Sequence, residues 1–515
     1  AMTGCEDTDP SGPGEVVVAD TTADTVTVIS SEGDSLTIVT TTVTTKTVDV
    51  STQEVLSTSD TSWADTTTGS PAKSLTLTDA SITAGDSVTL KAAIEYTIDG
   101  FVFVEDGAVL TIPAGTVLKG KPGGGLNASA LIICRGAKIM AEGTAKKPII
   151  MTALNDDLEY ADDLGGSTRG LWGGLIVLGK AVTQRKDGVE QIEGIDPNDD
   201  RGQYGGSDDA DNSGVIKYVS IRYGGTNIGE GNEINGLTMG AVGSGTTIDY
   251  VEVYNNADDG FEWFGGAAQC KHLAAVGCGD DSYDWDEGFR GKGQFWVVVQ
   301  SEDAGDRAAE MDGCASDNRG DTKRFSQPTI YNATFVGSGA ESGNYGNMIF
   351  KLREETGGYY YNSIFTDFYG DLKIDGTLNL VGVINFDDGK GSEGNLVSDH
   401  VLSGDLELAN NIFYGFSNGA ETPEMLIKFS DVADDTLADS TTRRDSLVSI
   451  VAANNTFDQD PGVARDNLLP TKGGEAFTGT RKALPSKDSF FEKADYIGAF
   501  GGTDWLAGWS FFSQM

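Results

Sequence analysis

Short runs of alternating apolar and polar residues, separated by glycine-rich turns, recur from about residue 75 to the C-terminus. The segment 107–116 is echoed by 136–144, and the segment 216–221 by 248–253. Alternation with a period of two predicts short β-strands, and no stretch shows an amphipathic helical pattern. We therefore expect an all-β chain built from internal repeats.

The clearest repeat combines acidic and aromatic residues. Residues 258–266 read DDGFEWFGG and residues 280–288 read DDSYDWDEG, with a weaker third copy at 306–313. This repeat is too short for the ~40–45 residues of a four-stranded propeller blade. Repeats of 20–30 residues are typical of solenoids, in which each coil stacks on the one before. The sequence thus predicts a parallel β-helix.

A second repeated feature is an asparagine three residues before a phenylalanine. Stacked coils place equivalent side chains on one another, so we expect these phenylalanines to form one interior column. The four pairs are Asn332 and Phe335, Asn362 and Phe365, Asn410 and Phe413, and Asn454 and Phe457.

Three regions follow from the pattern: 1–14 as a leader or anchor, 15–74 as a Thr- and Val-rich β segment or stalk, and 75–515 as the β-helix with a Trp-rich C-terminal cap. Trp505 and Trp509 are expected to plug the last coil. Alternating β-branched residues prefer strands, but a lone hairpin buries too little to be stable. Residues 15–70 would therefore pack on their own β-helix, add strands to a neighbouring subunit in a head-to-tail filament, or form a flexible stalk.

Charge narrows the function classes. The chain has 36 basic and 79 acidic residues, a net charge of −43, with 38% apolar residues that can fill a core. Such a field repels nucleic acid phosphates and anionic membranes and attracts cations, although solubility in saline water explains it equally simply. No run of 18 apolar residues predicts a transmembrane helix.

Cysteine usage points to export. Small residues precede Cys5 and acidic residues follow it, as at the junction where bacterial lipoproteins are cut and acylated; a cloned remnant or a free Cys5 is the alternative. Of the other four cysteines, Cys278 and Cys314 end neighbouring repeats and are the expected disulfide. We therefore expect an extracellular or cell-surface protein, anchored to the outer membrane by a lipid if Cys5 is acylated.

The motifs also carry a family resemblance. Residues 101–152 resemble the first coils of right-handed β-helix proteins of bacterial surfaces, which belong to the pectate-lyase-like solenoid class. From Trp172 to Trp509 the chain is similar to a group of exported or lipid-anchored bacterial β-helix proteins, through segments 171–179, 231–238 and 495–500 and the acidic aromatic repeat. The resemblance implies a right-handed parallel β-helix and supplies no catalytic set.

Stacked acids suggest calcium as a cofactor. Coils lie ~4.8 Å apart, so carboxylates in register repel one another unless a cation neutralises them. Ca²⁺ accepts 6–8 oxygen ligands and suits such a cluster, whereas solvated turn acids are the simpler interpretation. The candidate ligands are Asp258, Asp259, Glu262, Asp280, Asp281, Asp284 and Glu310.

A second candidate calcium loop begins at Asp209. Asp209, Asp211 and Ser213 alternate before Gly214, which matches the start of a D-x-D-x-S-G loop. The bidentate glutamate of an EF-hand is missing, since Ser220 occupies that position. In so Asp-rich a chain, chance matches of this kind are common.

Two sequence features bear on glycans. Trp263 and Trp285 occupy equivalent positions in adjacent coils, which suits either an internal stack or a ladder for acidic or neutral glycans. A calcium-dependent polysaccharide lyase also needs a base, and Arg290 and Lys292 directly follow the acidic repeat. Such residues more often simply pair with neighbouring acids.

The leading hypothesis is a non-enzymatic, calcium-stabilised surface protein with an adhesive or structural role, contacting glycans or assembling with itself. The alternative is a calcium-dependent polysaccharide lyase.

Overall fold

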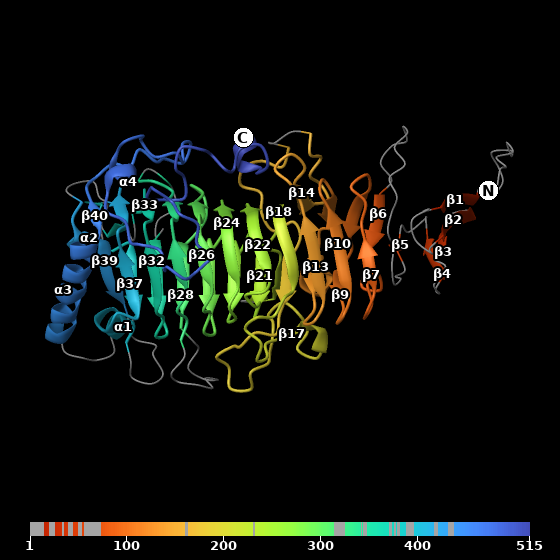
Figure 1. Cartoon of the computed structure of the whole chain (residues 1–515), viewed down its shortest axis with the longest axis horizontal. Coiled ribbons are helices and arrows are strands. Elements are labelled where there is room, and N and C mark those ends of the chain that lie inside the picture. The colour runs from red at the N-terminus through yellow and green to blue at the C-terminus, as the bar shows by residue number, and fades with distance from the viewer. Residues whose placement is uncertain are drawn as a thin grey trace.

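The computed structural model describes residues 74–515 and five strands between residues 15 and 55, leaving aside 160–162, 230–231, 314–324, 341, 343–347, 370–372, 375–376, 379–381, 388–395, 417–420 and 431–436. The chain coils into one right-handed parallel β-helix, with its first coils next to the N-terminal strands and helix α3 at the opposite end (Figure 1). The predicted β-helix is confirmed.

Each coil crosses three faces, which we number in chain order. Face 1 is a ten-stranded parallel sheet that stands apart from the other two. Its strands are β9 (Phe101–Val104), β12 (Ala130–Ile133), β15 (Leu175–Leu178), β21 (Leu237–Gly240), β23 (Phe261–Phe264), β25 (Tyr283–Asp286), β28 (Arg307–Asp312), β31 (Met348–Arg353), β36 (Ile384–Asp387) and β39 (Ile427–Ser430).

Faces 2 and 3 share three long strands that bend across their common corner, namely β18 (Gly214–Arg222), β22 (Thr247–Tyr254) and β24 (Gln269–Val276). Face 2 also contains β7 (Ser87–Thr89), β10 (Val109–Pro113), β13 (Lys138–Glu142), β26 (Lys292–Gln294), β29 (Thr329–Tyr331), β32 (Gly358–Tyr361) and β37 (Leu406–Ala409). Face 3 also contains β6 (Ser74–Leu77), β8 (Glu95–Ile98), β11 (Val117–Gly120), β14 (Ile149–Ala153), β27 (Val297–Val299), β30 (Thr334–Val336), β33 (Ile364–Thr366), β38 (Ile412–Tyr414) and β40 (Thr456–Phe457).

The remaining elements after β6 lie in the turns between the faces or, after β40, in the C-terminal segment. The small strands are β16 (Glu190–Gln191), β17 (Gln203–Tyr204), β19 (Asn227–Gly229), β20 (Asn232–Glu233), β34 (Lys373–Ile374) and β35 (Thr377–Leu378). The helices are α1 (Val397–Ser403), α2 (Pro423–Leu426), α3 (Leu437–Asn454) and α4 (Glu475–Thr478), with 3₁₀ turns at Gly125–Asn127, Asp200–Gly202 and Phe512–Gln514. The sequence did not predict α3, because its apolar residues do not gather on one face of the helix.

The predicted phenylalanine column is confirmed in the interior of face 3. Phe335, Phe365, Phe413 and Phe457 are register partners on β30, β33, β38 and β40. Their ring centroids are separated by 5.4, 5.1 and 5.5 Å in that order. Stacks of this kind add to the free energy of burying each ring, so every coil stabilises the next.

The asparagines before these phenylalanines turn the chain from face 2 to face 3. Asn332, Asn362 and Asn410 have φ between 55° and 59°, in the left-handed region that asparagine tolerates better than most residues. The amides of Asn332 and Asn362 also donate to Tyr496 O and Lys482 O, in the C-terminal segment. Asn454 differs from the other three because it ends helix α3.

The C-terminal segment runs back from the α3 end to the middle of the solenoid (Figure 1). Trp505 and Trp509 contact Tyr250 there, with ring centroids 6.0 and 6.1 Å away. Buried Glu252 accepts hydrogen bonds from the backbone N–H groups of Phe511 and Phe512, at 2.7 and 2.9 Å. The expectation that Trp505 and Trp509 plug the last coil is therefore wrong.

At the other end, five strands precede the first coil: β1 (Glu15–Ala19), β2 (Val26–Glu32), β3 (Ser35–Val39), β4 (Thr45–Asp49) and β5 (Glu54–Val55). They pair consecutively and antiparallel, and β5 pairs with β6 through Glu54 and Thr76. This pairing corresponds to the alternative in which the Thr-rich segment packs on its own β-helix.

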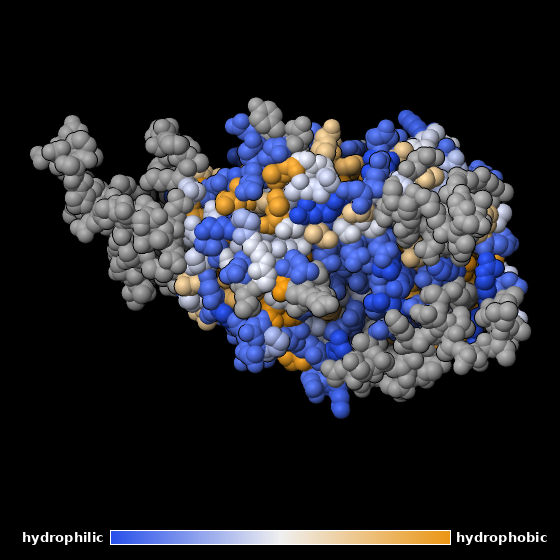
Figure 2. All heavy atoms as spheres, turned by 180° about the vertical axis from the view of Figure 1, so that it is seen from behind, coloured by the Kyte–Doolittle hydropathy of each residue, from blue (hydrophilic) through white to orange (hydrophobic). Residues whose placement is uncertain are grey.

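The face of the molecule seen from behind is mainly hydrophilic where it is coloured (Figure 2). In the view from behind, apolar atoms form separate small areas among hydrophilic ones (Figure 2). The large apolar side chains exposed within the described part of the chain are Leu154, Leu402 and Met515. None of the helices described there is long and apolar enough to cross a membrane.

Candidate metal centre

The acidic aromatic repeat forms strands β23 and β25 of face 1. Phe261 and Trp263 point into the core, while Glu262 lies on the outer side of the sheet. Glu262, Asp284 and Glu310 are register partners on three adjacent strands, so their carboxylates form one outward column. We call these three residues the acidic column. The stacking expected from the sequence is confirmed.

A second row of acids lies just before these strands. The Asp259 carboxylate accepts a hydrogen bond from Asp281 N at 2.8 Å, and the Asp281 carboxylate accepts one from Arg307 N at 2.7 Å. Each aspartate therefore links its own coil to the next one. Arg307 replaces the aspartate in the third copy of the repeat, which explains why that copy is weak.

Basic residues neutralise the Glu310 half of the acidic column. The Arg307 and Arg353 guanidinium groups lie 2.6 Å from the Glu310 carboxylate, and Lys351 Nζ lies 3.6 Å from it. Arg353 also pairs with Asp312. Burial alone would raise the pKa of Glu310, but these cations hold it below its ordinary value.

Around Glu262 the described part of the chain forms no such ion pairs. Asp259, Glu262 and Asp284 each place a carboxylate oxygen within 4.8 Å of the others. Asp259 and Glu262 are 7% and 8% exposed, and Asp284 Oδ1 is buried without a hydrogen-bond donor. Among the described residues no ion pair reaches any of the three. Burial first, and like charge second, raise their pKa values well above the ordinary range.

Two further sets of three carboxylates adjoin this triad and extend toward solvent. Asp258, Asp259 and Asp280 form one, and Asp280, Asp281 and Asp306 form the other. Asp280 is exposed, so the set has a route to solvent. A donor set made only of carboxylate oxygens from neighbouring coils fits Ca²⁺, which takes 6–8 oxygens at 2.3–2.6 Å in flexible geometry.

The candidate loop at Asp209 is organised differently. The Asp209 carboxylate accepts from Val182 N at 3.0 Å and lies 3.2 Å from the Arg290 guanidinium. Asp211 accepts a hydrogen bond from Ser213 Oγ at 3.3 Å. The acid groups that could hold a metal in the described part of the chain do not include this loop. Its first ligand position is taken by Arg290, which disfavours calcium there.

The two candidate catalytic bases lie away from the acidic column. Arg290 donates to Gly288 O and pairs with Asp209. Lys292 is on face 2, where its Nζ lies 2.5 Å from Asp488. Sequence proximity to the repeat was misleading, because the chain turns from face 1 to face 2 directly after β25. The assignment of Arg290 and Lys292 as bases for chemistry at this column is therefore wrong.

The tryptophans of the repeat are internal. Trp263 and Trp285 are both 0% exposed, and Trp263 stacks on Trp296 with centroids 5.1 Å apart. Successive side chains of a strand point to opposite faces of the sheet, so on β23 and β25 the tryptophan rings point inward because the acids between them and their neighbours point outward. The glycan-stacking role is therefore wrong for both, and the internal stack is what forms.

The three cysteines of the described residues form no disulfide bond. Cys134, Cys270 and Cys278 are buried free thiols. The free thiol of Cys278 counts against the expected bridge to Cys314, which itself lies outside the described residues, as does Cys5.

Sequence reasoning missed the basic residues of the column and two neighbours of Glu262. The positions of the three basic residues follow from strand register alone, once the third copy of the repeat is aligned; they are Arg307, Lys351 and Arg353. Asn235 donates to Glu262 and, at 3.4 Å, to Glu193. Glu193 lies in an irregular segment without periodicity, so no sequence signal indicates it.

Comparison with known proteins bears on the fold. A family model described as a pectate-lyase-like β-helix domain matches residues 80–440. No curated protein and no solved structure matches the chain. The match spans more than half of the chain and coincides with the coils that carry the acidic column, so the chain belongs to the pectate-lyase-like β-helix family.

Proposed function

We propose that the chain is a non-enzymatic β-helix protein of the cell surface or the extracellular medium, stabilised by calcium bound at Asp259, Glu262 and Asp284. The observation that carries the proposal is the convergence of three carboxylates from adjacent coils, two of them buried (Asp259 and Glu262), which no ion pair among the described residues reaches. Isolated buried charges cost several kcal/mol. A bound divalent cation removes that cost and joins the coils.

The ligand types favour calcium among the common metal ions. Every candidate donor is an oxygen, whereas Zn²⁺ sites are dominated by Cys and His ligands. Mg²⁺ demands a near-ideal octahedron and usually retains several waters, which suits a buried set of carboxylates poorly. Asp258 and Asp280 add oxygens at the more exposed side of the triad.

The two arginines beside Glu310 argue against catalysis. A lyase base must accept a proton, so it must be able to lose its own. Arg307 and Arg353 pair with buried carboxylates, and although burial opposes the effect, those charges raise both pKa values above the ordinary value for arginine. Both side chains therefore stay protonated and act as counter-ions.

Thermal unfolding with and without calcium tests the proposal. An ion that binds only the folded state stabilises by RT ln(1+[L]/Kd), about 2.7 kcal/mol at a hundredfold excess over Kd. We expect a higher midpoint in calcium than in chelator, a smaller effect of magnesium, and loss of the calcium effect in Glu262→Gln. Equal midpoints for the unmodified protein in calcium and chelator would contradict the proposal.

A calcium-dependent polysaccharide lyase is the second candidate. One feature favours it: Lys351 follows Glu310 in the same outward column, so basic and acidic side chains share face 1. Incubation with acidic polysaccharides, read by ultraviolet absorbance of unsaturated products, decides. Turnover that is lost in Lys351→Ala would replace the non-enzymatic proposal.

Adhesive contact with glycans and head-to-tail assembly belong to the same proposal. A long rigid solenoid with a net charge of −43 suits a cation-rich exterior. Light scattering of the whole chain beside a chain starting at Pro71 tests assembly through residues 15–70. Two monomers of ordinary compactness would exclude it.

A further inference from the structure

A long insertion leaves the solenoid between β15 and β18. Residues 179–213 occupy the turn from face 1 to face 2 and contain β16, the turn Asp200–Gly202 and β17. The insertion projects from the lower edge of the solenoid around β17 (Figure 1). It covers part of the outer side of face 1, next to the acidic column.

Apolar contacts anchor the insertion to the early coils. Its side chains join a buried cluster with residues of face 1, separate from the solenoid interior. Tyr204 packs on Phe264 with centroids 6.0 Å apart, and its hydroxyl donates to Glu287 at 2.7 Å. The Arg185 guanidinium pairs with Glu287 at 2.5 Å. These contacts require no metal ion.

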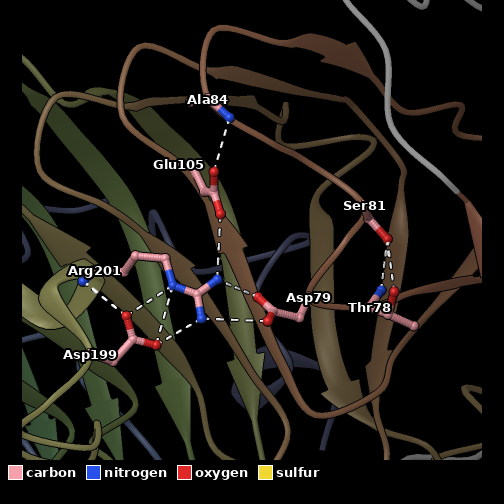
Figure 3. Close-up of polar contacts among 7 residues, drawn as sticks. All are labelled: Thr78, Asp79, Ser81, Ala84, Glu105, Asp199 and Arg201. Carbon is pink, nitrogen blue, oxygen red and sulfur yellow. Dashed lines mark hydrogen bonds and ion pairs between the residues drawn. The ribbon is translucent and has the colours of Figure 1, made fainter.

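A charged anchor lies on the other side of the insertion. The Arg201 guanidinium contacts Asp79 at 2.6 Å, Asp199 at 2.7 Å and Glu105 at 3.4 Å, so it connects the insertion to the first coils (Figure 3). It also lies 3.8 Å from the centroid of the Phe103 ring. Every charge in this anchor has a partner of opposite sign.

The third contact is different in kind, because it joins like charges. Asn235 Nδ2 donates to Glu193 Oε1 of the insertion at 3.4 Å and to Glu262 of the acidic column. Glu193 is the neighbouring charge that contributes most, after burial, to the raised pKa of Glu262. Asn235 is 1% exposed and its Oδ1 is buried without a hydrogen-bond donor.

The Asn235 side chain reaches both carboxylates, and its unpartnered Oδ1 is an oxygen of the kind that Ca²⁺ takes as a ligand. Half a turn of the Asn235 amide exchanges its oxygen and nitrogen, which offers Oδ1 to an ion held by Glu262. The neighbouring Asp284 Oδ1 is likewise buried without a donor. These unpartnered oxygens point to a cation independently of the number of acids.

We propose that Glu193 and Asn235 complete the calcium site, so that the ion fastens the insertion to face 1. The inference rests on the proposed function and extends it: calcium would control the closure of the insertion over the acidic column. Together with Asp259, Glu262 and Asp284, the site then has five ligand side chains, which reach the 6–8 oxygens of a calcium shell when some carboxylates bind through both oxygens.

We call this fastening of the insertion to face 1 by calcium the clasp. Limited trypsin digestion of the full chain tests the clasp, because exposed Lys186 lies within the insertion. Cleavage after Lys186, identified by mass, should be about tenfold slower in calcium than in chelator, which corresponds to about 1.4 kcal/mol of closure. In Glu193→Gln this protection should disappear, while calcium still raises the unfolding midpoint of the solenoid.

Two variants serve as controls. Arg201→Gln removes an anchor that needs no ion, so cleavage should accelerate in both calcium and chelator. Asp200→Asn removes an exposed acid of the insertion that lies away from the cleaved bond and should behave like the unmodified protein.

The outcomes separate the two proposals. If calcium raises the midpoint but does not slow cleavage, or protects Glu193→Gln as it protects the unmodified protein, the clasp is wrong and the calcium-stabilised solenoid stands. If calcium changes neither the midpoint nor the cleavage, the proposed function fails and the clasp with it.

Discussion

Glu262 and Glu310 are the same residue type in the same outward column, two strands apart, and their surroundings are opposite. Glu310 lies among Arg307, Lys351 and Arg353, and its pKa is lowered although burial opposes this. Glu262 lies among further acids, and its pKa is raised. The fold neutralises one half of the column with its own side chains, whereas no ion pair among the described residues reaches the other half.

The difference teaches that a stacked row of acids has two physical solutions. In the first solution the charge changes sign from one coil to the next at the same register position, as from Asp281 to Arg307. The ion pairs then offset the cost of removing the charges from water. In the second solution the position keeps one sign and recruits a mobile cation, which makes stability depend on the medium.

The largest expected effect comes from breaking the self-neutralised half. Arg307→Gln leaves Asp281, Asp306 and Glu310 without their shared counter-ion, and loss of one partner from a buried ion network costs about 3–5 kcal/mol. Urea unfolding at neutral pH measures it. Lys493→Gln is the matched control, since the Lys493–Asp495 pair is exposed and its loss should change stability by less than about 1 kcal/mol. Equal effects of the two substitutions would mean that the network is not what stabilises these coils.

The next effect sharpens the comparison through two identical substitutions. In chelator, Glu310→Gln should destabilise by about 2–3 kcal/mol, because the cations around it lose a hydrogen-bonded charge. Glu262→Gln should be neutral or stabilise by about 1 kcal/mol, since one unit of raised pKa corresponds to about 1.4 kcal/mol and the amide can still accept from Asn235. The same sign and size for both would contradict the division of the column.

The smallest expected effect is a pH dependence of the metal-free protein. Where a folded-state pKa is raised, stability is fully present below the unfolded pKa and is lost as pH rises toward the folded value. For Asp259, Glu262 and Asp284 this loss begins near pH 4, their ordinary range. The unfolding midpoint in chelator should therefore fall from pH 5 to pH 8, and the calcium effect should grow over the same range because binding needs deprotonated ligands. A calcium effect that shrinks as pH rises would argue against carboxylate ligands.

Much of the fold could be predicted from short-range repetition. In a solenoid, a side chain meets its equivalent one coil later, so residues 258–266 and 280–288 reveal strand, register and facing at once. The same logic predicted the column from Phe335 to Phe457. It failed where the chain leaves the repeat, because contacts of a loop with a distant coil leave no period in the sequence. Glu193 beside Glu262, Arg290 beside Asp209, and Trp509 beside Tyr218 are contacts of that kind.

The most direct measurement is a crystal structure of the full chain grown with calcium, with the ion located by its anomalous scattering. The account predicts one ion bound by carboxylate oxygens of Asp259, Glu262 and Asp284 at about 2.3–2.6 Å, and none between Glu310 and its basic partners. Carboxylates that stay in contact without an ion at saturating calcium, or an ion at Glu310 instead, would contradict it.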